Sequence, residues 1–381
     1  MWFLYALLIP LATVDAALLG KDLEPTFFDI NVDRDHPEKI YKAFEDFIVK
    51  YKRHYKDDIE KKFRFNNFVK TYNKVDELNA KSEAAGYDTK YGINKFADWS
   101  SSEFSGTLSH VPPPNNTNIP HLKINSFFRA IDNTTRKKRK ATRYPDEFDL
   151  RDAKINGRYV VGPIKNQGKC ACCWGFAVTA VMETVNAVNS GKFSSLSDQE
   201  LCDCATDGTP GCKGGALDMG IRYVAKYGQS SDDDYPYDET RASVSRRCKV
   251  KSTDRVIRPK AMQFVQINPR RAESEIIHVL VNWKIPVGVY FKVGQNFKDY
   301  KEGVIVEDDC RRAEEWHAGA VVGYGSVNDR RGRAQDYWII KNSWDDDWGE
   351  GGYVRVKRGV DWCAIEDKPV TGDMSSHSDA Y

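Results

Sequence analysis

The stretch at residues 162–177, GPIKNQGKCACCWGFA, decides the fold of this 381-residue chain. Beyond its cysteines, apolar residues recur at steps of three and four, at Trp174, Ala177, Val181, Val185 and Val188. Gly191 then supplies a stop signal, so the spacing predicts a helix that begins at Cys173.

A cysteine at the start of a helix is a candidate nucleophile. The free N–H groups and the positive dipole end of the helix favour the thiolate form of Cys173. An unperturbed thiol with a pKa of ~8.5 is only about 0.1% ionised at pH ~5.5, so a nucleophile in an acidic compartment needs this help. A lone cysteine at such a position is more often a bridge or a buried thiol, and a base must therefore be found.

Three histidines follow Cys173 in the chain. His377 lies in the polar C-terminal tail, and His278 lies in an apparent helix, where a structural role fits better. His317 stands just before an apolar, strand-like run and is the candidate base. A second such run ends at Asn342, whose side chain could orient the imidazole as the third member of a triad.

Composition excludes several function classes. With 41% hydrophobic and 12% aromatic residues, the chain can form a core, and its length fits two or three structural units. The formal net charge of +2 gives no global field for nucleic acid or an anionic membrane. Nine cysteines, an odd number, imply bridges plus at least one free thiol in an oxidising compartment.

The N-terminus and a later linker indicate a secreted precursor. Residues 1–16 are interpreted as a signal peptide, with a signal anchor as the alternative, and no later segment is long and apolar enough to span a membrane. We expect a secretory-pathway protein, secreted to the extracellular space or lysosomal. Residues 105–143 form a predicted linker with glycosylation sequons at Asn115 and Asn133.

The basic run at residues 136–140, RKKRK, lies inside this linker. It is interpreted as a cleavage site for a trypsin-like or furin-like processing enzyme, because nicking concentrates in exposed, unpacked backbone. A solvated charged loop is the alternative, and a nuclear-targeting interpretation conflicts with the signal peptide.

Residues 40–100 contain a predicted helix with one distinctive face, formed by Glu60, Arg64, Phe68, Thr71, Val75 and Asn79. This face resembles the Glu-Arg-Phe-Asn-Ile-Asn signature of propeptides of papain-like cysteine proteases, with Thr71 for the first Asn and Val75 for Ile. Residues 92–98, GINKFAD, resemble the second signature, G-x-N-x-F-x-D. The resemblance implies a segment that runs backwards through the enzyme's cleft and blocks it until removed.

The chain from Tyr144 to about Cys363 resembles papain and the cathepsin L-like endopeptidases of the peptidase C1 family. The resemblance implies an α+β, papain-like two-lobed fold, a helical lobe plus a β-barrel lobe, with a helical propeptide. The expected domains are a signal peptide at 1–16, an inhibitory propeptide at 17–143 and a peptidase domain at 144–381.

Local patterns agree with this class. The sequence SDQE at residues 197–200 is a predicted capping box that opens a second helix, and a third is indicated at residues 217–224 before Gly228. Strand-like patterns follow at residues 287–291 and 353–356. Helices followed by strands indicate an α+β protein.

The same resemblance assigns roles to single residues. Cys173 would be the nucleophile, His317 the general base and acid, and Asn342 the residue that orients His317. Gln167 would form the oxyanion hole with the backbone N–H of Cys173. Trp344 would shield the Asn and His side chains from water.

Substrate-binding residues also follow from the resemblance. Gly214 and Gly215 would let a peptide backbone approach closely. Other residues would line the pocket for the substrate's P2 side chain: Ala216, Leu217, Tyr290, Ala318 and Lys368. Lys368 is unusual in an apolar pocket, and it either extends into solvent or favours an acidic P2 residue.

Family correspondence pairs six cysteines, Cys170 with Cys212, Cys204 with Cys248, and Cys310 with Cys363. Cys172 and Cys202 are departures from the family, and a fourth bridge between them would leave only Cys173 free. The cysteine clusters also suggest zinc, because thiolates are soft ligands. The signal peptide favours oxidation, and neither a metal nor another cofactor is expected.

Three further departures from the family bear on the site, and one of them is Trp316, directly before His317. Gly175 follows Trp174, and Asp345 replaces the Gly expected after Trp344, a position where Asp tolerates positive φ. No segment between Cys212 and Cys248 is long enough for the occluding loop of cathepsin B-like exopeptidases, so an endopeptidase is favoured.

Two functions of different classes remain. The leading one is a secreted or lysosomal zymogen of a papain-like cysteine endopeptidase, a monomer that hydrolyses protein or peptide substrates and is inhibited by its own propeptide. The alternative is a catalytically silent homologue that acts as a binding or protease-inhibitor protein. Every catalytic position is filled, which favours the enzyme, although a vicinal bridge between Cys172 and Cys173 would quench the thiol.

Overall fold

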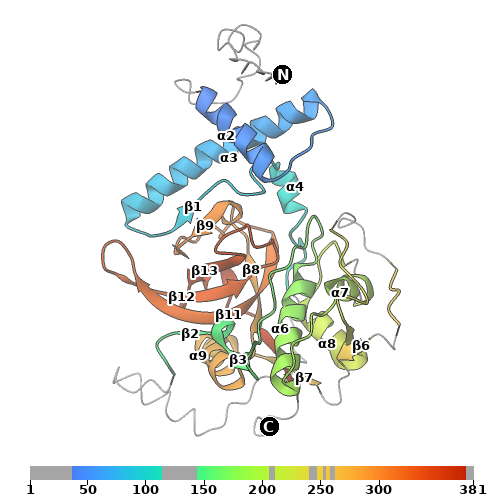
Figure 1. Cartoon of the computed structure of the whole chain (residues 1–381). Helices are drawn as coiled ribbons and strands as arrows, with labels where there is room; N and C mark the ends of the chain where they lie inside the picture. Colours follow the sequence, from blue (N-terminus) through green and yellow to red (C-terminus); the bar gives the residue numbers. More distant parts are fainter. Residues whose placement is uncertain are drawn as a thin grey trace, which may run out of the picture. The chain divides into compact units, whose positions relative to one another are not determined.

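The computed structural model describes residues 37–113, 144–205, 211–239, 247–251, 255–257 and 262–374. The chain divides into two compact units, residues 1–73 and 74–381. Figure 1 shows the helices and strands of both units. The predicted signal peptide, the sequons at Asn115 and Asn133, the basic run at 136–140 and His377 lie outside the described residues. Within these ranges, every helix is too short or too polar to cross a bilayer.

The first unit is built on two helices, α2 (Pro37–Lys50) and the first part of α3 (Asp58–Ala85). Phe44, Phe47 and Phe68 are buried between them, with ring centroids 5.2–5.3 Å apart for the pairs with Phe68. The predicted propeptide helix is therefore confirmed. Glu60 and Arg64 of its distinctive face form an ion pair of 3.4 Å one turn apart.

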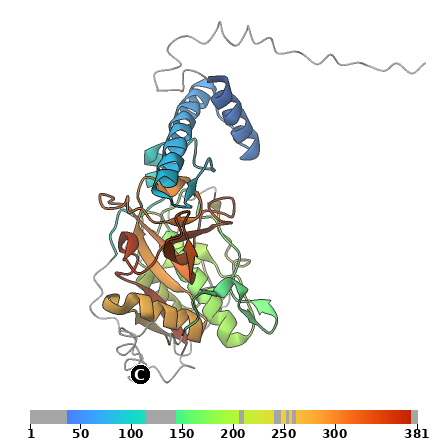
Figure 2. The same cartoon turned by 90° about the vertical axis from the view of Figure 1, so that its left-hand side faces the viewer.

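The helical lobe of the second unit consists of α6 (Cys173–Ser190), α7 (Asp198–Cys204) and α8 (Leu217–Tyr227). The start of α6 at Cys173 is as predicted, and Gly191 ends it at φ 71°, in the left-handed region where glycine has no Cβ penalty. Helix α6 is buried on nearly every side, and it contacts the sheet as well as α7 and α8 (Figures 1 and 2).

The predicted capping box at α7 forms only in part. The Ser197 hydroxyl accepts from the Glu200 backbone N–H at 3.0 Å, as expected of an N-cap. The Ser197 N–H, however, donates to the Ser230 carbonyl at 3.0 Å, and the buried Glu200 carboxylate accepts from the Ser230 N–H at 2.6 Å and from Tyr223. Tertiary partners on α8 and β5 (Gln229–Ser230) take over the second half of the box.

The second lobe is an eight-stranded sheet with the order β10-β13-β12-β11-β8-β14-β7, in which β2 also pairs with β11. All pairs are antiparallel except β10 with β13. Its strands are β2 (Phe148–Asp149), β7 (Met262–Gln266), β8 (Val287–Lys292), β10 (Val304–Ile305), β11 (Trp316–Asn328), β12 (Ala334–Lys341), β13 (Tyr353–Lys357) and β14 (Val370–Met374). Helices on one side and this sheet on the other confirm the α+β, two-lobed class.

Short elements complete the described chain: β1 (Lys90–Tyr91), α4 (Ser101–Ser105), β3 (Lys154–Ile155), β4 (Arg158–Tyr159), β6 (Arg255–Ile257), α9 (Ala272–His278) and β9 (Tyr300–Glu302). The propeptide strand β1 pairs with β9 of the peptidase domain. The side chain of Asn79, the last residue of the propeptide signature, makes two hydrogen bonds with the backbone of Tyr91 in β1. Asn79 Oδ1 accepts from the Tyr91 N–H at 2.9 Å, and Asn79 Nδ2 donates to the Tyr91 carbonyl at 3.0 Å.

Four disulfides join eight of the nine cysteines, in the pairs Cys170–Cys212, Cys172–Cys202, Cys204–Cys248 and Cys310–Cys363. Only Cys173 is free. Among the described residues, two groups of side chains lie close enough to hold a metal ion, Cys170 with Cys172 and Cys202, and Asp308 with Cys310 and Cys363. Every cysteine in them is in a disulfide and so is not a thiolate ligand.

The extra bridge explains the glycine after Trp174. A Cβ built on Gly175 would lie 2.9 Å from Cys172 Sγ and 3.6 Å from Cys202 Sγ. Contacts near 2.9 Å are too short for a carbon atom against sulfur, so a side chain at this position requires the bridge to move.

We therefore expect Gly175→Ala to destabilise the full chain by about 1 to 3 kcal/mol while the Cys172–Cys202 bridge is intact. With both cysteines replaced by alanine, the same substitution should cost nothing, because the sulfurs are gone. Urea unfolding in a Cys173→Ser background measures this. Gly106→Ala is the matched control, since its Cβ would make only ordinary contacts, the nearest at 3.4 Å. Equal stability of Gly175→Ala and its parent would contradict the coupling.

Candidate active site

Cys173 lies at the first turn of α6 and is almost completely buried. Burial raises the pKa of its thiol to about 12, although backbone hydrogen bonds from Ala318 and Trp174 act in the opposite direction. Ala318 directly follows His317 in β11, so this contact brings the sulfur to the strand that carries the candidate base. The thiol is thus held protonated in this state of the chain.

His317 and Asn342 meet across neighbouring strands. His317 is the second residue of β11, Asn342 directly follows the end of β12, and these strands pair with Ala320 opposite Lys341. His317 Nε2 lies 2.7 Å from Asn342 Oδ1. Because a carbonyl oxygen accepts, Nε2 is the donor and Nδ1 is the unprotonated nitrogen of the neutral ring.

The remaining ring nitrogen is available for proton transfer. His317 Nδ1 is buried and has no hydrogen-bond partner among the described residues. Burial lowers the pKa of His317 to about 4, and the hydrogen bond with Asn342 opposes this shift. Both members of the candidate pair are therefore neutral in this state, a thiol and an imidazole.

Trp344 covers the histidine. Its ring centroid lies 4.6 Å from that of His317, and Phe291 packs edge-on against the imidazole at 5.4 Å. Two propeptide side chains, Phe96 and Phe104, pack edge-on against Trp344 at 5.4 and 5.3 Å. Phe96 belongs to the second propeptide signature, so that signature contributes directly to covering the site.

Hydrogen bonds at both ends of its amide hold the Gln167 side chain in a fixed orientation. The Ser343 hydroxyl donates to its side-chain oxygen at 2.6 Å, and its amide nitrogen donates to the Cys170 carbonyl at 2.7 Å. The same nitrogen donates at 2.8 Å to the carbonyl of Thr107, two residues after the end of α4. A peptide carbonyl therefore occupies the donor that would stabilise an oxyanion.

Other propeptide contacts trace the path of this segment. Ser109 exchanges two backbone hydrogen bonds with Trp316, at 2.7 and 2.8 Å. Gly214 has φ 106°, and a Cβ there would collide with Ser109 Oγ. Lys368 Nζ donates to the Pro113 carbonyl at 2.7 Å. Residues of the segment 107–113 thus contact Gln167, Trp316, Gly214 and Lys368 in turn.

The residues predicted for the P2 pocket differ in the contacts that they make. Tyr290 pairs with Ala318 across β8 and β11, and its hydroxyl accepts from the Leu217 N–H at the start of α8. Burial raises the pKa of the Tyr290 hydroxyl, and a negative charge on the nearby Cys173 would raise it further. Ala216 is the N-cap of α8. The Lys368 ammonium donates to the Pro113 carbonyl.

Three other predicted positions also have clear surroundings. Gly215 lies against the indole of Trp174, where a Cβ would collide with the ring. Asp345 has φ 68°, the left-handed conformation expected for a residue in place of Gly. His278 ends α9, is buried, and bonds the Tyr144 hydroxyl at 2.8 Å, which agrees with a structural role.

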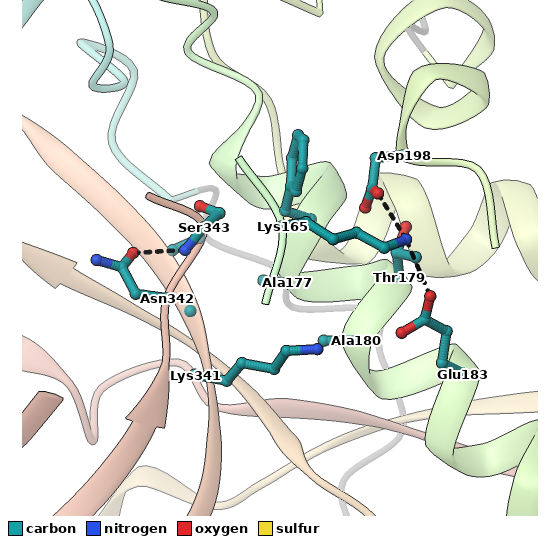
Figure 3. Close-up of a pocket in the computed structure, with 12 residues that line it drawn as sticks. Lys165, Ala177, Thr179, Ala180, Glu183, Asp198, Lys341, Asn342 and Ser343 are labelled. Carbon is teal, nitrogen blue, oxygen red and sulfur yellow. Dashed lines mark hydrogen bonds and ion pairs between the residues drawn. The ribbon is translucent and has the colours of Figure 1, made fainter. Parts of the chain in front are cut away.

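A buried charge cluster adjoins the triad (Figure 3). Lys165 Nζ lies 2.9 Å from Glu183 Oε1 and 2.8 Å from Asp198 Oδ2, and it donates to the Leu196 carbonyl at 2.7 Å. Burial raises the pKa of Asp198 to about 6, although Lys165 counteracts the shift. These residues and Asn342 line one cavity between the lobes.

Comparisons with known proteins agree with this geometry. The model of the papain family cysteine proteases matches residues 144–372, and the model of the cathepsin propeptide inhibitor domain matches residues 44–104. This chain belongs to the papain family. It is a cysteine-type endopeptidase with a propeptide inhibitor segment, as the resemblance implied.

Papain-family relatives cover most of the chain. A cathepsin L-like proteinase of Phaedon cochleariae is 33% identical over 324 residues, 84% of this chain and 90% of the relative. Fruit bromelain of Ananas comosus is 31% identical over 353 residues, 91% of this chain and 90% of the relative. The solved structure of digestive procathepsin L2 from the larval midgut of Tenebrio molitor has a TM-score of 0.73 and 28% identity, and covers 87% of this chain and 99% of that one.

Sequence reasoning missed the Lys165 cluster and Thr107. Lys165 stands two residues before Gln167 in the stretch that decides the fold, so its position was a usable signal. Asp198 was read only as part of a helix cap. Nothing local distinguishes Thr107 from other linker residues.

Replacing Lys165 by methionine should destabilise the Cys173→Ser chain by about 3 to 5 kcal/mol at pH ~7, because two buried carboxylates lose their cation. The loss should shrink as the pH falls below about 6, where Asp198 becomes protonated and no longer needs that cation. Urea unfolding at several pH values measures it, with the exposed Lys192→Met as control. A pH-independent loss would contradict the role of Asp198.

Proposed function

We propose that this chain is the zymogen of an endopeptidase in which Cys173 and His317 hydrolyse peptide bonds through an acyl-enzyme. One observation carries the proposal. The single free thiol, Cys173 at the start of α6, contacts the backbone of Ala318, next to His317. Nδ1 of His317 has no hydrogen-bond partner among the described residues. Asn342 holds the opposite nitrogen of that ring.

The proposed reaction has two stages. His317 Nδ1 takes the thiol proton, the sulfur attacks the peptide carbonyl carbon, and Gln167 with the Cys173 N–H stabilises the oxyanion. The imidazolium returns its proton to the leaving amine as the C–N bond breaks. Water then attacks the thioester with His317 as base, which releases the carboxylate product and restores the thiol.

The propeptide keeps Cys173 and His317 inactive because it occupies the site and excludes water from it. The Thr107 carbonyl already uses the Gln167 donor, and burial stabilises the neutral thiol and imidazole over the thiolate and imidazolium. When the propeptide, residues 17–143, leaves, water reaches both groups. The pKa of Cys173 then falls and that of His317 rises, so the ion pair becomes accessible.

Substrate, location and state of assembly belong to the same proposal. The substrates are proteins or peptides, and the mature domain, residues 144–381, acts as a monomer after export or delivery to lysosomes. A signal peptide at 1–16, the sequons and four disulfides support the secretory pathway. A similar protein, the procathepsin L2 of Tenebrio molitor, is described as digestive.

The disulfide pairing weighs against a silent homologue. Cys172 is bonded to Cys202, so it is not in a vicinal bridge that would quench Cys173. After acid activation, a thiol-directed epoxide should modify Cys173, as located by peptide mass analysis. Cys173→Ser should lower casein hydrolysis to the background, and an unmodified, inactive mature chain would reject the proposal.

Removal of the Gln167 side chain tests the oxyanion role. We expect Gln167→Ala to lower kcat by about 10²- to 10³-fold, since one oxyanion donor is lost, with a much smaller change in KM. Steady-state kinetics on a short peptide measure both constants. Ser190→Ala, at the other end of α6, serves as the control. A change in KM alone would point to binding instead.

Lys368 is proposed to favour an acidic P2 side chain. Its ammonium reaches a carbonyl of the segment that occupies the site, so a substrate in the same path would pass it. A positional peptide library should show Asp or Glu preferred at P2, and Lys368→Gln should abolish that preference without lowering turnover of neutral substrates. A library without acidic preference would assign Lys368 to solvent instead.

A further inference from the structure

The hairpin between β11 and β12 has a rigid, basic tip. Residues 329–333, DRRGR, form this tip, and the buried Asp329 carboxylate organises it. Asp329 Oδ1 accepts from the backbone N–H groups of Arg331 and Arg333, both at 2.9 Å, and Oδ2 accepts from Arg333 Nε at 2.7 Å. These bonds lie within the peptidase domain, so the shape of the tip does not depend on the propeptide.

The propeptide helix α3 ends next to this tip with an incomplete cap. Gly86, at φ 80°, donates to the Glu83 carbonyl, and Tyr87 donates to the Ser82 carbonyl, both at 2.9 Å. This is the Schellman arrangement, which satisfies two of the terminal carbonyls and leaves those of Ala84 and Ala85 to find other partners. The last turn of α3 contains no basic residue of its own.

The hairpin tip supplies the missing donors. Three donors meet three consecutive carbonyls: Arg331 Nη2 bonds Ala84 O, Arg333 Nη2 bonds Ala85 O at 2.8 Å, and the Arg330 N–H bonds Gly86 O at 3.1 Å. The cations also face the negative end of the helix dipole. A Cβ on Gly86 would collide with the Arg331 side chain, so the fit is close.

Acidic side chains flank these carbonyls and complement the tip. Arg330 pairs with Glu83 at 3.2 Å and with Asp88 at 3.4 Å. Arg333 also lies over the ring of Tyr87, 5.4 Å from its centroid. The surface therefore matches a helix C-terminus with carboxylates on either side of its last turn.

We propose that residues 329–333 form a docking site for the propeptide, separate from the active site and from the β1–β9 pairing, which recognises the C-terminal end of α3. Its residues are different from those that hold the inhibitory segment 107–113, namely Gln167, Gly214 and Trp316. Because one chain carries both bound segments, each contact raises the effective concentration of the other. The tip thereby holds the propeptide in place while segment 107–113 opens and recloses.

Hydrogen exchange in the full Cys173→Ser chain tests the docking site without any catalysis. Arg330→Glu replaces the ion pairs with Glu83 and Asp88 by two like-charge contacts. Amide hydrogen exchange in peptides covering residues 82–88 and 328–334 should therefore become about tenfold faster. Adding Glu83→Arg and Asp88→Arg should restore slow exchange. The control Arg311→Glu makes the same charge change at an arginine that pairs with Asp308.

The dependence of hydrogen exchange on ionic strength is an independent test of the docking site. Raising the ionic strength from about 0.05 to about 0.5 M should speed exchange at these peptides in the parent and slow it in Arg330→Glu, because screening weakens the attractions of the parent and the repulsions of the variant. If Arg330→Glu fails to fold, Glu83→Arg with Asp88→Arg makes the same test from the propeptide side. Exchange no faster than in Arg311→Glu, or no recovery in the charge-swapped chain, would overturn the proposal.

A second readout links the docking site to latency and rests on the proposed function. In the chain with Cys173 intact, the thiol-directed epoxide should label uncleaved Arg330→Glu zymogen several-fold faster than uncleaved parent. Equal rates for the two uncleaved chains would show that the tip does not contribute to latency. If processed enzyme also stays unlabelled, the proposed function fails, while the exchange experiment still decides the docking site.

Discussion

The hydrogen bond between His317 and Asn342 determines what the rest of the site can do. Because the Asn342 oxygen accepts, the neutral ring keeps its proton on Nε2 and presents Nδ1 as the base. The bond exists because β11 and β12 are paired in one register, and a slip of one residue would turn the side chains to the other face of the sheet. Chemistry at Cys173 thus depends on strand pairing in the other lobe.

Burial has two opposite effects in this chain. Around Cys173 and His317 it favours neutral groups, which suits an inactive precursor, since neither group gains a charged partner there. Around Lys165 it encloses real charges, which Glu183 and Asp198 compensate at short distance. The same interface between lobes therefore contains a neutral pair and a cluster that carries charge at neutral pH.

Local patterns predicted much of the fold, because apolar spacing and glycine stops act over a few residues. The start of α6 at Cys173 and its end at Gly191 followed from such spacing, and so did α8. His317 and Asn342 were candidates because each adjoins an apolar, strand-like run, and the family resemblance then assigned their roles. The contacts of Thr107, Lys165 and the 329–333 tip were not predicted, because their partners lie far away in the sequence and no periodicity links them.

Eight cysteines must be oxidised while the ninth stays reduced, and the folded precursor has a chemical means to separate them. Disulfide exchange proceeds through thiolates, and a buried thiol with a pKa of about 12 supplies almost none at neutral pH. The segment that fills the site therefore also keeps the Cys173 sulfur unreactive until that segment is removed. In the folded precursor, burial under this segment limits exchange between Cys173 and the adjacent Cys172–Cys202 bridge.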